Sequence, residues 1–364
     1  MSRWERVRLG DVCEKGSSGI AQKDLDGNEG PYPIYGAGGL IKHVDFYQQD
    51  RPCIAVVKDG AGVGRVTLLP GRASVIGTMQ YILPRDHVEL AYLYYGLTKL
   101  KLGRFHTGAT IPHIYFKDYQ EEQIPLPPLP VQRAIAAALG QAAALIALRK
   151  RQLEKLDLLV KARFAELFGD PVRNEMGWAC EPLEKHADVL TGHPFDSGKY
   201  TETGIKICGG LIVMPDRIAW ESAKHWESAQ GLERYLLEEN DIVLAMDRPW
   251  ISGGFKIAKI ARRELPALLI QRTARVRGTG IGQAFLFWML NNERFRLHCK
   301  VTETTVPHIS IGDIKKYEIF LPPLPLRQAF ARFVEQTQAQ KQALMRAQKK
   351  LQLQYDALMQ KYFM

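Results

Sequence analysis

The sequence lacks the residue patterns that disulfide frameworks and metal sites require. It has five cysteines in 364 residues, widely spaced and without a Cys-x-x-Cys pair. Its nine histidines form neither a His-Glu-x-x-His motif nor a His-x3–5-His cluster. An odd number of scattered cysteines is typical of reduced thiols in a cytosolic protein. We therefore expect no metal site and no disulfide framework.

Long apolar runs are also absent. The most apolar stretch, 134–148, is interrupted by Gly140 and Gln141 and is shorter than the roughly 20 residues that cross a bilayer. The first residues, Met1–Arg6, are not followed by the apolar core of a signal sequence. These features predict a cytoplasmic protein that does not associate with a membrane.

Complete catalytic motifs are missing as well. The segment Asp247-Arg248-Pro249-Trp250 is the nearest match to the Asp/Asn-Pro-Pro-aromatic cluster of amino-methyltransferases, but an arginine replaces the first proline. The glycine runs 36–39 and 60–64 lack the strand–helix context of a dinucleotide-binding loop. There is no Walker motif and no nucleophile–base arrangement. We expect no catalysis by this chain and no cofactor.

What the chain does contain is basic charge and enough apolar residues for globular domains. Lysine and arginine number 49 against 39 aspartates and glutamates, a net charge of +10, and 46% of the residues are hydrophobic. A basic balance of this size favours nucleic acid or another anionic surface as the partner.

An internal duplication is the strongest signal in the sequence. Residues 110–132 and 305–327 align without a gap at an offset of 195 residues, and both contain the run Leu-Pro-Pro-Leu-Pro. The other identities are Thr110/Thr305, Pro112/Pro307, His113/His308, Ile114/Ile309, Asp118/Asp313 and Ile124/Ile319. Because His113 and His308 occur in both copies, we expect them to support the fold rather than to read a ligand. The chain is predicted to be two copies of one unit.

Each copy continues into a long predicted helix. Residues spaced alternately by four and three run from Ile135 to Leu167, and the same stripe runs from Phe330 to Tyr362. Such steps predict a coiled-coil seam. The two helices are each other's simplest partners; the alternative is two amphipathic helices that each pack on their own domain. They also concentrate positive charge: seven basic residues stand against three acidic ones in 131–168, and seven against two in 326–362. Phosphate groups or a second subunit would suit this charge.

The segments before the helices are rich in short strands separated by glycine and proline. We expect an α+β fold with an internal repeat, in which two similar domains are each followed by a long helix. The expected boundaries are 1–130 for the first domain, 131–169 for the first helix, 170–325 for the second domain and 326–364 for the second helix.

These features together resemble the specificity subunit of type I restriction–modification systems. The residues that carry the resemblance are the repeated Pro-His-Ile and Leu-Pro-Pro-Leu-Pro segments with their helices, the junction 167–174 followed by Gly177-Trp178, and the run 32–39. Family members often have Glu-Gln after the Leu-Pro-Pro-Leu-Pro run, where this chain has Val131-Gln132 and Leu326-Arg327.

The resemblance implies a pseudo-twofold fold, in which two target-recognition domains are joined by two long helices in an antiparallel coiled coil. It implies a non-catalytic subunit that binds a bipartite, asymmetric site in double-stranded DNA. It implies two modification (methyltransferase) subunits and the restriction subunits as partners, with the first helix in the docking region. A competing hypothesis is a coiled-coil adaptor whose flanking domains bind protein. Divergence of the loops around a constant hinge and helix favours DNA recognition.

We expect DNA contacts from the loops before the two hinges and from basic residues beside the glycine-rich turns. Arginine and lysine pair with guanine or phosphate, threonine methyls contact thymine, and tryptophan stacks or wedges between bases. A fold-supporting role is the alternative for each residue. The candidates are Lys58, Arg65, Arg104, His106, Thr107 and Thr110 in the first domain, and Arg248, Trp250, Thr302, Thr304 and Thr305 in the second.

Overall fold

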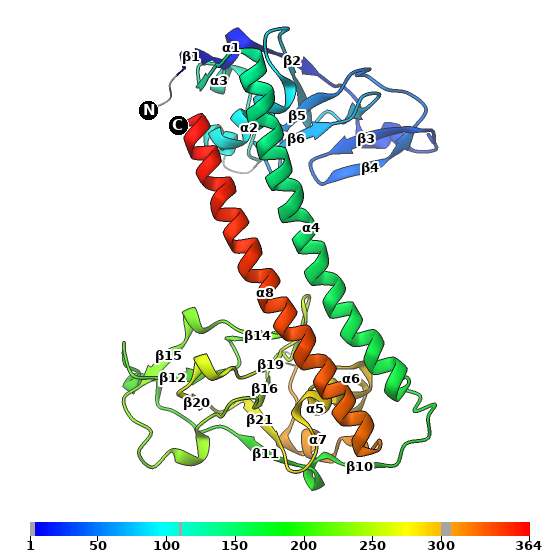
Figure 1. Ribbon diagram of the computed structural model, residues 1–364, viewed down its shortest axis with the longest axis vertical. Helices are drawn as coiled ribbons and strands as arrows, with labels where there is room; N and C mark the ends of the chain where they lie inside the picture. The colour runs from blue at the N-terminus through cyan, green and yellow to red at the C-terminus, as the bar shows by residue number, and fades with distance from the viewer. Residues whose placement is uncertain (1–3, 109–110, 300–306) are drawn as a thin grey trace. The chain divides into compact units, whose positions relative to one another are not determined.

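A computed structural model describes residues 4–108, 111–299 and 307–364 (Figure 1). The chain forms two compact units. Unit 1 comprises residues 1–152 and 344–364, and unit 2 comprises residues 153–343. Each unit contains an α+β domain and portions of both long helices.

Unit 1 is built on a four-stranded antiparallel sheet in the order β2-β8-β5-β6. The central strand β5 is buried along its whole length, because it is apolar at all five positions and packs on both faces. A three-stranded sheet, β4-β3-β7, combines one antiparallel and one parallel pair. The strands are β1 (Arg6–Arg8), β2 (Cys13–Ser17), β3 (Tyr32–Gly36), β4 (Gly39–Val44), β5 (Cys53–Val57), β6 (Val66–Leu69), β7 (Ser74–Val75), β8 (Met79–Pro84) and β9 (Gln123–Pro125). The helices are α1 (Leu9–Val12), α2 (Leu90–Leu100), α3 (Phe116–Tyr119) and the 3-10 turns η1 (Gln22–Leu25) and η2 (Leu102–Phe105).

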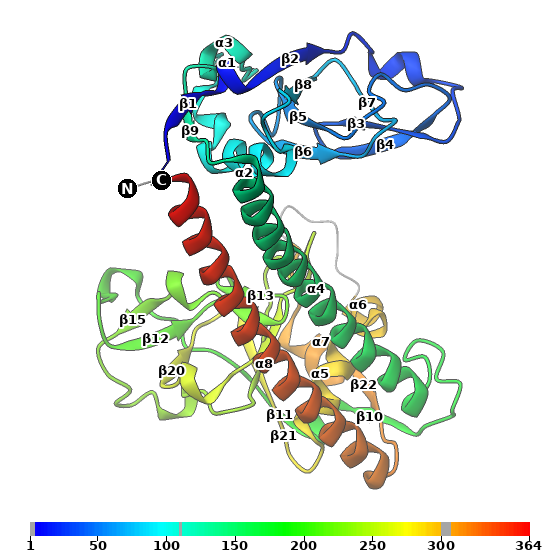
Figure 2. The same cartoon turned by 45° about the horizontal axis from the view of Figure 1, so that its top comes forward.

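Unit 2 repeats this plan with larger loops. Its four-stranded sheet has the order β11-β21-β16-β19, and Figure 2 shows β11 and β21 side by side. The strands are β10 (Cys180–Pro182), β11 (Ala187–Thr191), β12 (Ile205–Cys208), β13 (Val213–Met214), β14 (Arg217–Ile218), β15 (Lys224–Trp226), β16 (Ile242–Ala245), β17 (Trp250–Ile251), β18 (Gly254–Phe255), β19 (Ile257–Lys259), β20 (Ala267–Leu269), β21 (Thr273–Gly278) and β22 (Glu318–Phe320). The helices are α5 (Gln283–Leu290), α6 (Glu293–Cys299) and α7 (Ile311–Lys316), with 3-10 turns η3 (Leu183–Lys185), η4 (Ser197–Lys199), η5 (Trp220–Ser222), η6 (Glu233–Tyr235) and η7 (Arg262–Glu264).

The duplication extends to strand pairing. The three-stranded sheet of unit 2, β15-β12-β20, again has one antiparallel and one parallel pair. The strand that opens each domain pairs with the strand just before the long helix, β1 with β9 and β10 with β22. The two units therefore share one topology, which confirms the predicted α+β repeat.

The repeated Pro-His-Ile segment has the same structural role in both units. In unit 1, the Pro112 carbonyl accepts from the Gly60 amide at 2.9 Å, and the Ile114 amide donates to the Lys58 carbonyl at 2.8 Å. In unit 2, the Pro307 carbonyl accepts from Arg248 and the Ile309 amide donates to Met246, both at 2.8 Å. The segment thus fastens the loop that follows the central strand. This pairing agrees with the supporting role expected for His113 and His308.

The two long helices are α4 (Leu129–Phe168) and α8 (Leu324–Phe363), and they form the predicted antiparallel coiled coil. Every position of the predicted four-three stripe is buried or partly buried. In unit 1, Ile135 and Leu139 of α4 share a core with Met359 and Phe363 of α8. In unit 2, the ring of Phe164 lies 5.5 Å from that of Phe330. Each helix contributes to both cores.

Both helices begin two residues earlier than expected. Proline suits the first turn of a helix because its missing N–H would have no partner there. The second position of the family's Glu-Gln pair, Gln132 and Arg327 in this chain, has the same role in both units. The side chain of Gln132 donates to the Pro127 carbonyl at 2.8 Å, and Arg327 donates to the equivalent Pro322 carbonyl at 3.0 Å.

Within the described part of the chain, α4 is the one helix long and apolar enough to cross a membrane by length and composition. This is weak evidence, because core helices of soluble proteins meet the same criteria. Its residues Ile135, Leu139, Val160, Phe164 and Phe168 are buried in the protein cores.

Candidate nucleic-acid interface

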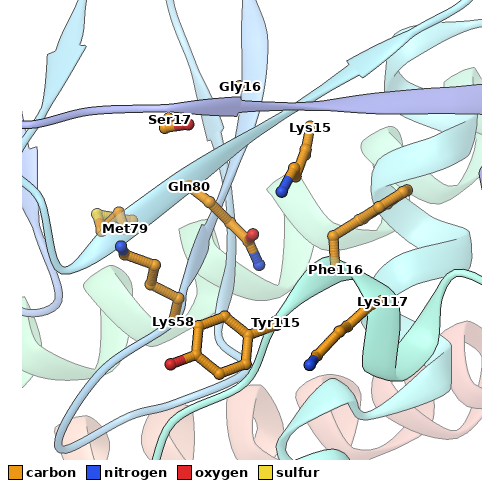
Figure 3. Close-up of a pocket in the computed structure, with 9 residues that line it drawn as sticks. All are labelled: Lys15, Gly16, Ser17, Lys58, Met79, Gln80, Tyr115, Phe116 and Lys117. Atoms are coloured by element: carbon orange, nitrogen blue, oxygen red, sulfur yellow. The ribbon is translucent and has the colours of Figure 1, made fainter.

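Unit 1 has a small basic hollow where three elements meet. Its cavity measures about 240 Å³, and Figure 3 shows the side chains that line it. Lys15 comes from β2, Lys58 from the loop after β5, and Lys117 from α3. Tyr115 lies beside them, and its side chain is 48% exposed. Three cations and an exposed aromatic ring make a surface suited to phosphates and bases.

The charges of this hollow are mostly uncompensated. Lys58 lies 3.7 Å from the carboxylate of Asp59, and the ammonium of Lys117 lies 5.6 Å from the centre of the Tyr115 ring. Among the described residues, Lys15 and Lys117 have no ion-pair partner. The buried Gln80 is held by a 2.9 Å hydrogen bond that it donates to the Tyr119 hydroxyl. The hollow therefore has a fixed floor and a positive rim.

Of the residues predicted for unit 1, Lys58 lines this hollow and the others have roles around it. Arg65 donates to the Ala37 carbonyl at 2.7 Å, which ties the glycine-rich loop to the end of β3. Arg104 pairs with Glu122 at 2.5 Å and lies over the Phe105 ring.

His106 bonds the Gly103 carbonyl through Nδ1, and the Thr107 backbone pairs with His113. The side chains of His106 and Thr107 are exposed, whereas Thr110 lies outside the described residues.

Unit 2 has a larger pocket, with a cavity of about 600 Å³. Its floor is apolar and includes Ile207, Ile212 and Ile270. Its basic lining comes from four side chains on different segments, Lys224, Arg248, Lys256 and Arg272. The combination suits a ligand with apolar faces and negative charge, as a stacked and phosphorylated base has.

Two arginines of this pocket have unusual backbone conformations. Arg248 has φ +45° and Arg272 has φ +61°, a left-handed region that residues other than glycine rarely occupy. Such conformations cluster at functional sites, where the surrounding structure maintains them. The Arg248 guanidinium has no hydrogen-bond partner among the residues that the structure describes. It is free to bind an anion.

Asp247 organises the other side of the pocket. It accepts hydrogen bonds from His308 Nδ1 and from Arg272, both at 2.7 Å. Burial alone raises the pKa of this carboxyl, but the hydrogen bonds and charges of Arg272 and His308 outweigh burial and lower its pKa. The carboxylate therefore orients the Arg272 guanidinium at the pocket edge.

The tryptophan predicted to stack on bases is engaged in the protein itself. Trp250 stacks on Phe255 with ring centroids 4.8 Å apart and packs on the main core of unit 2. Its contacts disfavour insertion of the indole into DNA. The remaining candidates, Thr302, Thr304 and Thr305, lie outside the described residues.

Sequence reasoning missed Lys15, Tyr115 and Lys117 in unit 1, and Lys224, Lys256 and Arg272 in unit 2. A signal for two of them lay inside the repeat. Tyr115 and Lys117 of the first copy correspond to Ser310 and Gly312 of the second. If the two copies bind different ligands, we expect the binding residues at positions where the copies differ in sequence.

The described residues contain no group of histidine, cysteine, aspartate and glutamate side chains arranged to hold a metal ion.

Comparison with known proteins identifies relatives of one kind. The family model described as the type I restriction modification DNA specificity domain matches residues 1–158. The type I restriction enzyme MjaVIII specificity subunit of Methanocaldococcus jannaschii is 28% identical, over 96% of this chain and 91% of that protein. The type I restriction enzyme EcoAI specificity subunit of Escherichia coli is 30% identical, over 49% of this chain and 31% of that protein.

A crystal structure of the type I restriction–modification S subunit from M. genitalium has the same fold. It superposes with a TM-score of 0.68 over all of this chain and 96% of that one, at 16% sequence identity.

Proposed function

Because this chain belongs to the specificity subunits of type I restriction–modification systems, we propose that each of its units reads one half of a bipartite, asymmetric site in double-stranded DNA. The chain is the non-catalytic recognition subunit of a multisubunit complex. The unit 1 hollow and the unit 2 pocket are the proposed reading surfaces.

The main support for the proposal is that the two units share a scaffold but differ in the residues that line the unit 1 hollow and the unit 2 pocket. The repeated Pro-His-Ile segment makes the same backbone bonds in both. Around it, the exposed Tyr115 and Lys117 of unit 1 are replaced by Ser310 and Gly312 in unit 2, and Lys58 corresponds to Met246, which is buried in the core. Unit 2 presents Arg248 and Arg272 instead. Such a difference is expected when one fold must read two different base sequences.

We propose distinct roles for the individual candidates. Lys58 and Arg248, together with Lys15 and Lys117, contact phosphates or guanine edges. The exposed His106 and Thr107 are proposed DNA contacts of unit 1. Arg65 and Arg104, which are held by the protein, orient the loops. Thr110, Thr302, Thr304 and Thr305 lie outside the described residues and stay proposed DNA contacts, whereas Trp250 supports the unit 2 surface from the core.

The same proposal assigns a role to each segment of the chain. We propose residues 1–130 and 170–325 as the recognition domains, and 131–169 and 326–364 as the spacer helices. Exposed apolar residues of α4, such as Leu145, Leu148 and Leu158, are available for a subunit contact. The proposed partners are two modification subunits and the restriction subunits, in the cytoplasm and without a membrane contact.

An exchange of one domain tests this function. The chain with residues 170–323 replaced by the matching segment of another specificity subunit is assembled with its modification subunit, and the methylated motif is read by long-read sequencing. We expect one half of the motif to change and the other half to stay. If both halves changed together, or if the motif did not depend on this chain, independent reading by the units would be wrong. Independence of the motif from this chain would favour an adaptor.

A further inference from the structure

Leu211 of unit 2 is the most exposed of the large apolar side chains that the structure describes. It is 88% exposed, whereas the next residue, Ile212, is 6% exposed. A single exposed leucine needs no explanation by itself. Leu211, however, also lines the 600 Å³ pocket, together with Lys224, Arg248 and Arg272.

The loop that carries Leu211 is held in place rather than extended into solvent. The amides of Ile212 and Val213 both donate to the Gly209 carbonyl, at 3.0 and 3.2 Å, and the Ala219 amide donates to the Ile212 carbonyl at 2.8 Å. These bonds close a turn with Leu211 near its tip. Gly210, just before it, lies against β16, where an added Cβ would be 3.6 Å from the Ala245 Cβ. The leucine is presented from a fixed turn.

The surroundings of Leu211 are suited to a polyanion. Arg248 has no hydrogen-bond partner among the described residues, and Lys256 is 7% exposed with no ion pair in the same part of the chain. The nearby carboxylate, Asp247, is already engaged by Arg272 and His308. Positive charge around a protruding apolar side chain disfavours an apolar protein partner and favours nucleic acid.

The corresponding position in unit 1 has no side chain. The Ile76 amide donates to the Tyr35 carbonyl as the Ile270 amide donates to Cys208, so the loops after β3 and β12 correspond. Counted from this shared bond, Gly38 occupies the place of Leu211. Leu211 thus has no counterpart at this position of unit 1, where the exposed Leu40 lies two residues further along, in β4, and does not line the hollow.

From these observations we propose that Leu211 inserts between neighbouring bases of the half-site that unit 2 reads, while the surrounding lysines and arginines bind the flanking phosphates. Leucine is among the residues that unstack a base step in this way. The energy of unstacking depends on the step, so Leu211 contributes to sequence specificity without a hydrogen bond to any base. This inference rests on the proposed function, because it assigns a half-site to unit 2.

The test uses the full chain assembled with its modification subunit on duplexes that contain its motif. The fluorescent base 2-aminopurine is placed in turn at each step of both half-sites, since its emission rises when it is unstacked. The variants are Leu211→Ala, the conservative Leu211→Met, and Leu297→Ala, which removes another leucine of unit 2 that is 57% exposed and does not line the pocket.

Methyltransferases flip their target base out of the stack, so a signal at the base to be methylated should persist in every variant and shows that the complex has assembled. Apart from that base, we expect one unstacked step in the half-site of unit 2 with the wild-type chain, with Leu211→Met and with Leu297→Ala. Leu211→Ala should lose the signal at that step and weaken specific binding about tenfold or more.

An unchanged unstacking signal in Leu211→Ala would overturn the proposal. Loss of affinity without any unstacked step in the wild type would also overturn it and would make Leu211 a groove contact. These outcomes are distinct from failure of the proposed function, in which the domain exchange leaves the motif unaltered. In that case unit 2 would read no half-site, and this inference would be wrong as well.

Discussion

At the scale of single residues, the repeated and the unrepeated positions have different roles. The residues common to both copies support the fold: Asp118 and Asp313 accept the backbone N–H of Tyr115 and Ser310, and Ile114 and Ile309 are fully buried. These roles follow from the sequence, because a residue kept in both copies serves what the copies share. The surface residues follow less readily. The exposure of Leu211 and the packing of Trp250 depend on tertiary contacts that no spacing in the sequence encodes.

Two glycines in the glycine-rich loop of unit 1 are required for different physical reasons. Gly60 has φ +82° and open space around it, whereas Gly64 has φ +81° and an added Cβ would lie 2.1 Å from the Gly103 amide nitrogen. Gly60→Ala should therefore cost about 1 kcal/mol for the strained backbone alone. Gly64→Ala should cost clearly more, since the loop must also move away from η2. Urea unfolding of the purified chains checks this; equal losses would contradict the steric argument.

Two aspartates of unit 2 should respond to pH in opposite ways. Hydrogen bonds from Arg272 and His308 lower the pKa of Asp247 despite its partial burial, so its ionised form stabilises the fold at pH 7. Burial raises the pKa of Asp216, and the neighbouring Asp157 adds to the shift against three lysines. Asp247→Asn should lower the free energy of unfolding by up to about 1 kcal/mol at pH 7.

Asp216→Asn should raise the free energy of unfolding at pH 7, because ionised Asp216 opposes folding and asparagine tolerates the left-handed φ of +59° at this position. The effect of Asp216→Asn should disappear as the pH falls through the raised pKa of Asp216 toward about 4. The effect of Asp247→Asn should fade only below about pH 4, as the pH falls toward the lowered pKa of Asp247. Unfolding free energies at pH 7 and pH 3.5 measure this, and effects of the same sign would contradict it.

At the scale of elements, the helices are the part most readily predicted from the sequence. Apolar spacing predicts a helix and its buried face independently of the rest of the fold. The observed helices begin two residues before the expected starts and end one residue before the expected ends. The strands β5 and β16 are similarly evident in the sequence as apolar runs. The short strands β13, β14 and β17 of unit 2 are not evident in the sequence, because each has only two residues and therefore shows no alternation of apolar and polar positions.

The aromatic cluster of unit 2 should dominate the attachment of α8 there. Phe330 is fully buried, and its ring lies 5.5 Å from those of both Phe164 and Phe168 on α4. Phe330→Ala leaves a cavity and should reduce the free energy of unfolding by about 3–5 kcal/mol. Gln336→Ala, an exposed position on the same helix, should change it by less than about 0.5 kcal/mol. The two variants are compared by urea unfolding, followed by the fluorescence of the tryptophans, to which those of unit 2 contribute. If Phe330→Ala reduced the free energy of unfolding only slightly, the aromatic cluster would lie outside the cooperative core.

At the scale of the whole molecule, we expect the length of the coiled coil to set the gap between the half-sites that the two units are proposed to read. Each helix has 40 residues, about 60 Å at 1.5 Å per residue. Successive major-groove sites on one face of a duplex are about 34 Å apart. The boundary between the compact units divides α4 after Gln152 and α8 after Ala343. These two positions allow the helices to be lengthened together without entering either core.

Insertion of one heptad after Gln152 and another after Ala343 tests whether the helices set the gap between half-sites. Seven residues preserve the four-three stripe, so the seam remains continuous in both helices. They add about 10 Å of rise, equivalent to about three base pairs at 3.4 Å each. We expect a methylated motif with both halves unchanged and a spacer longer by two to three base pairs. Insertion of two residues at the same positions is the control: it rotates the apolar stripe to the opposite side of the helix and should abolish activity. An active heptad variant that keeps the original spacer would mean that the partner subunits, rather than the helices, measure the distance.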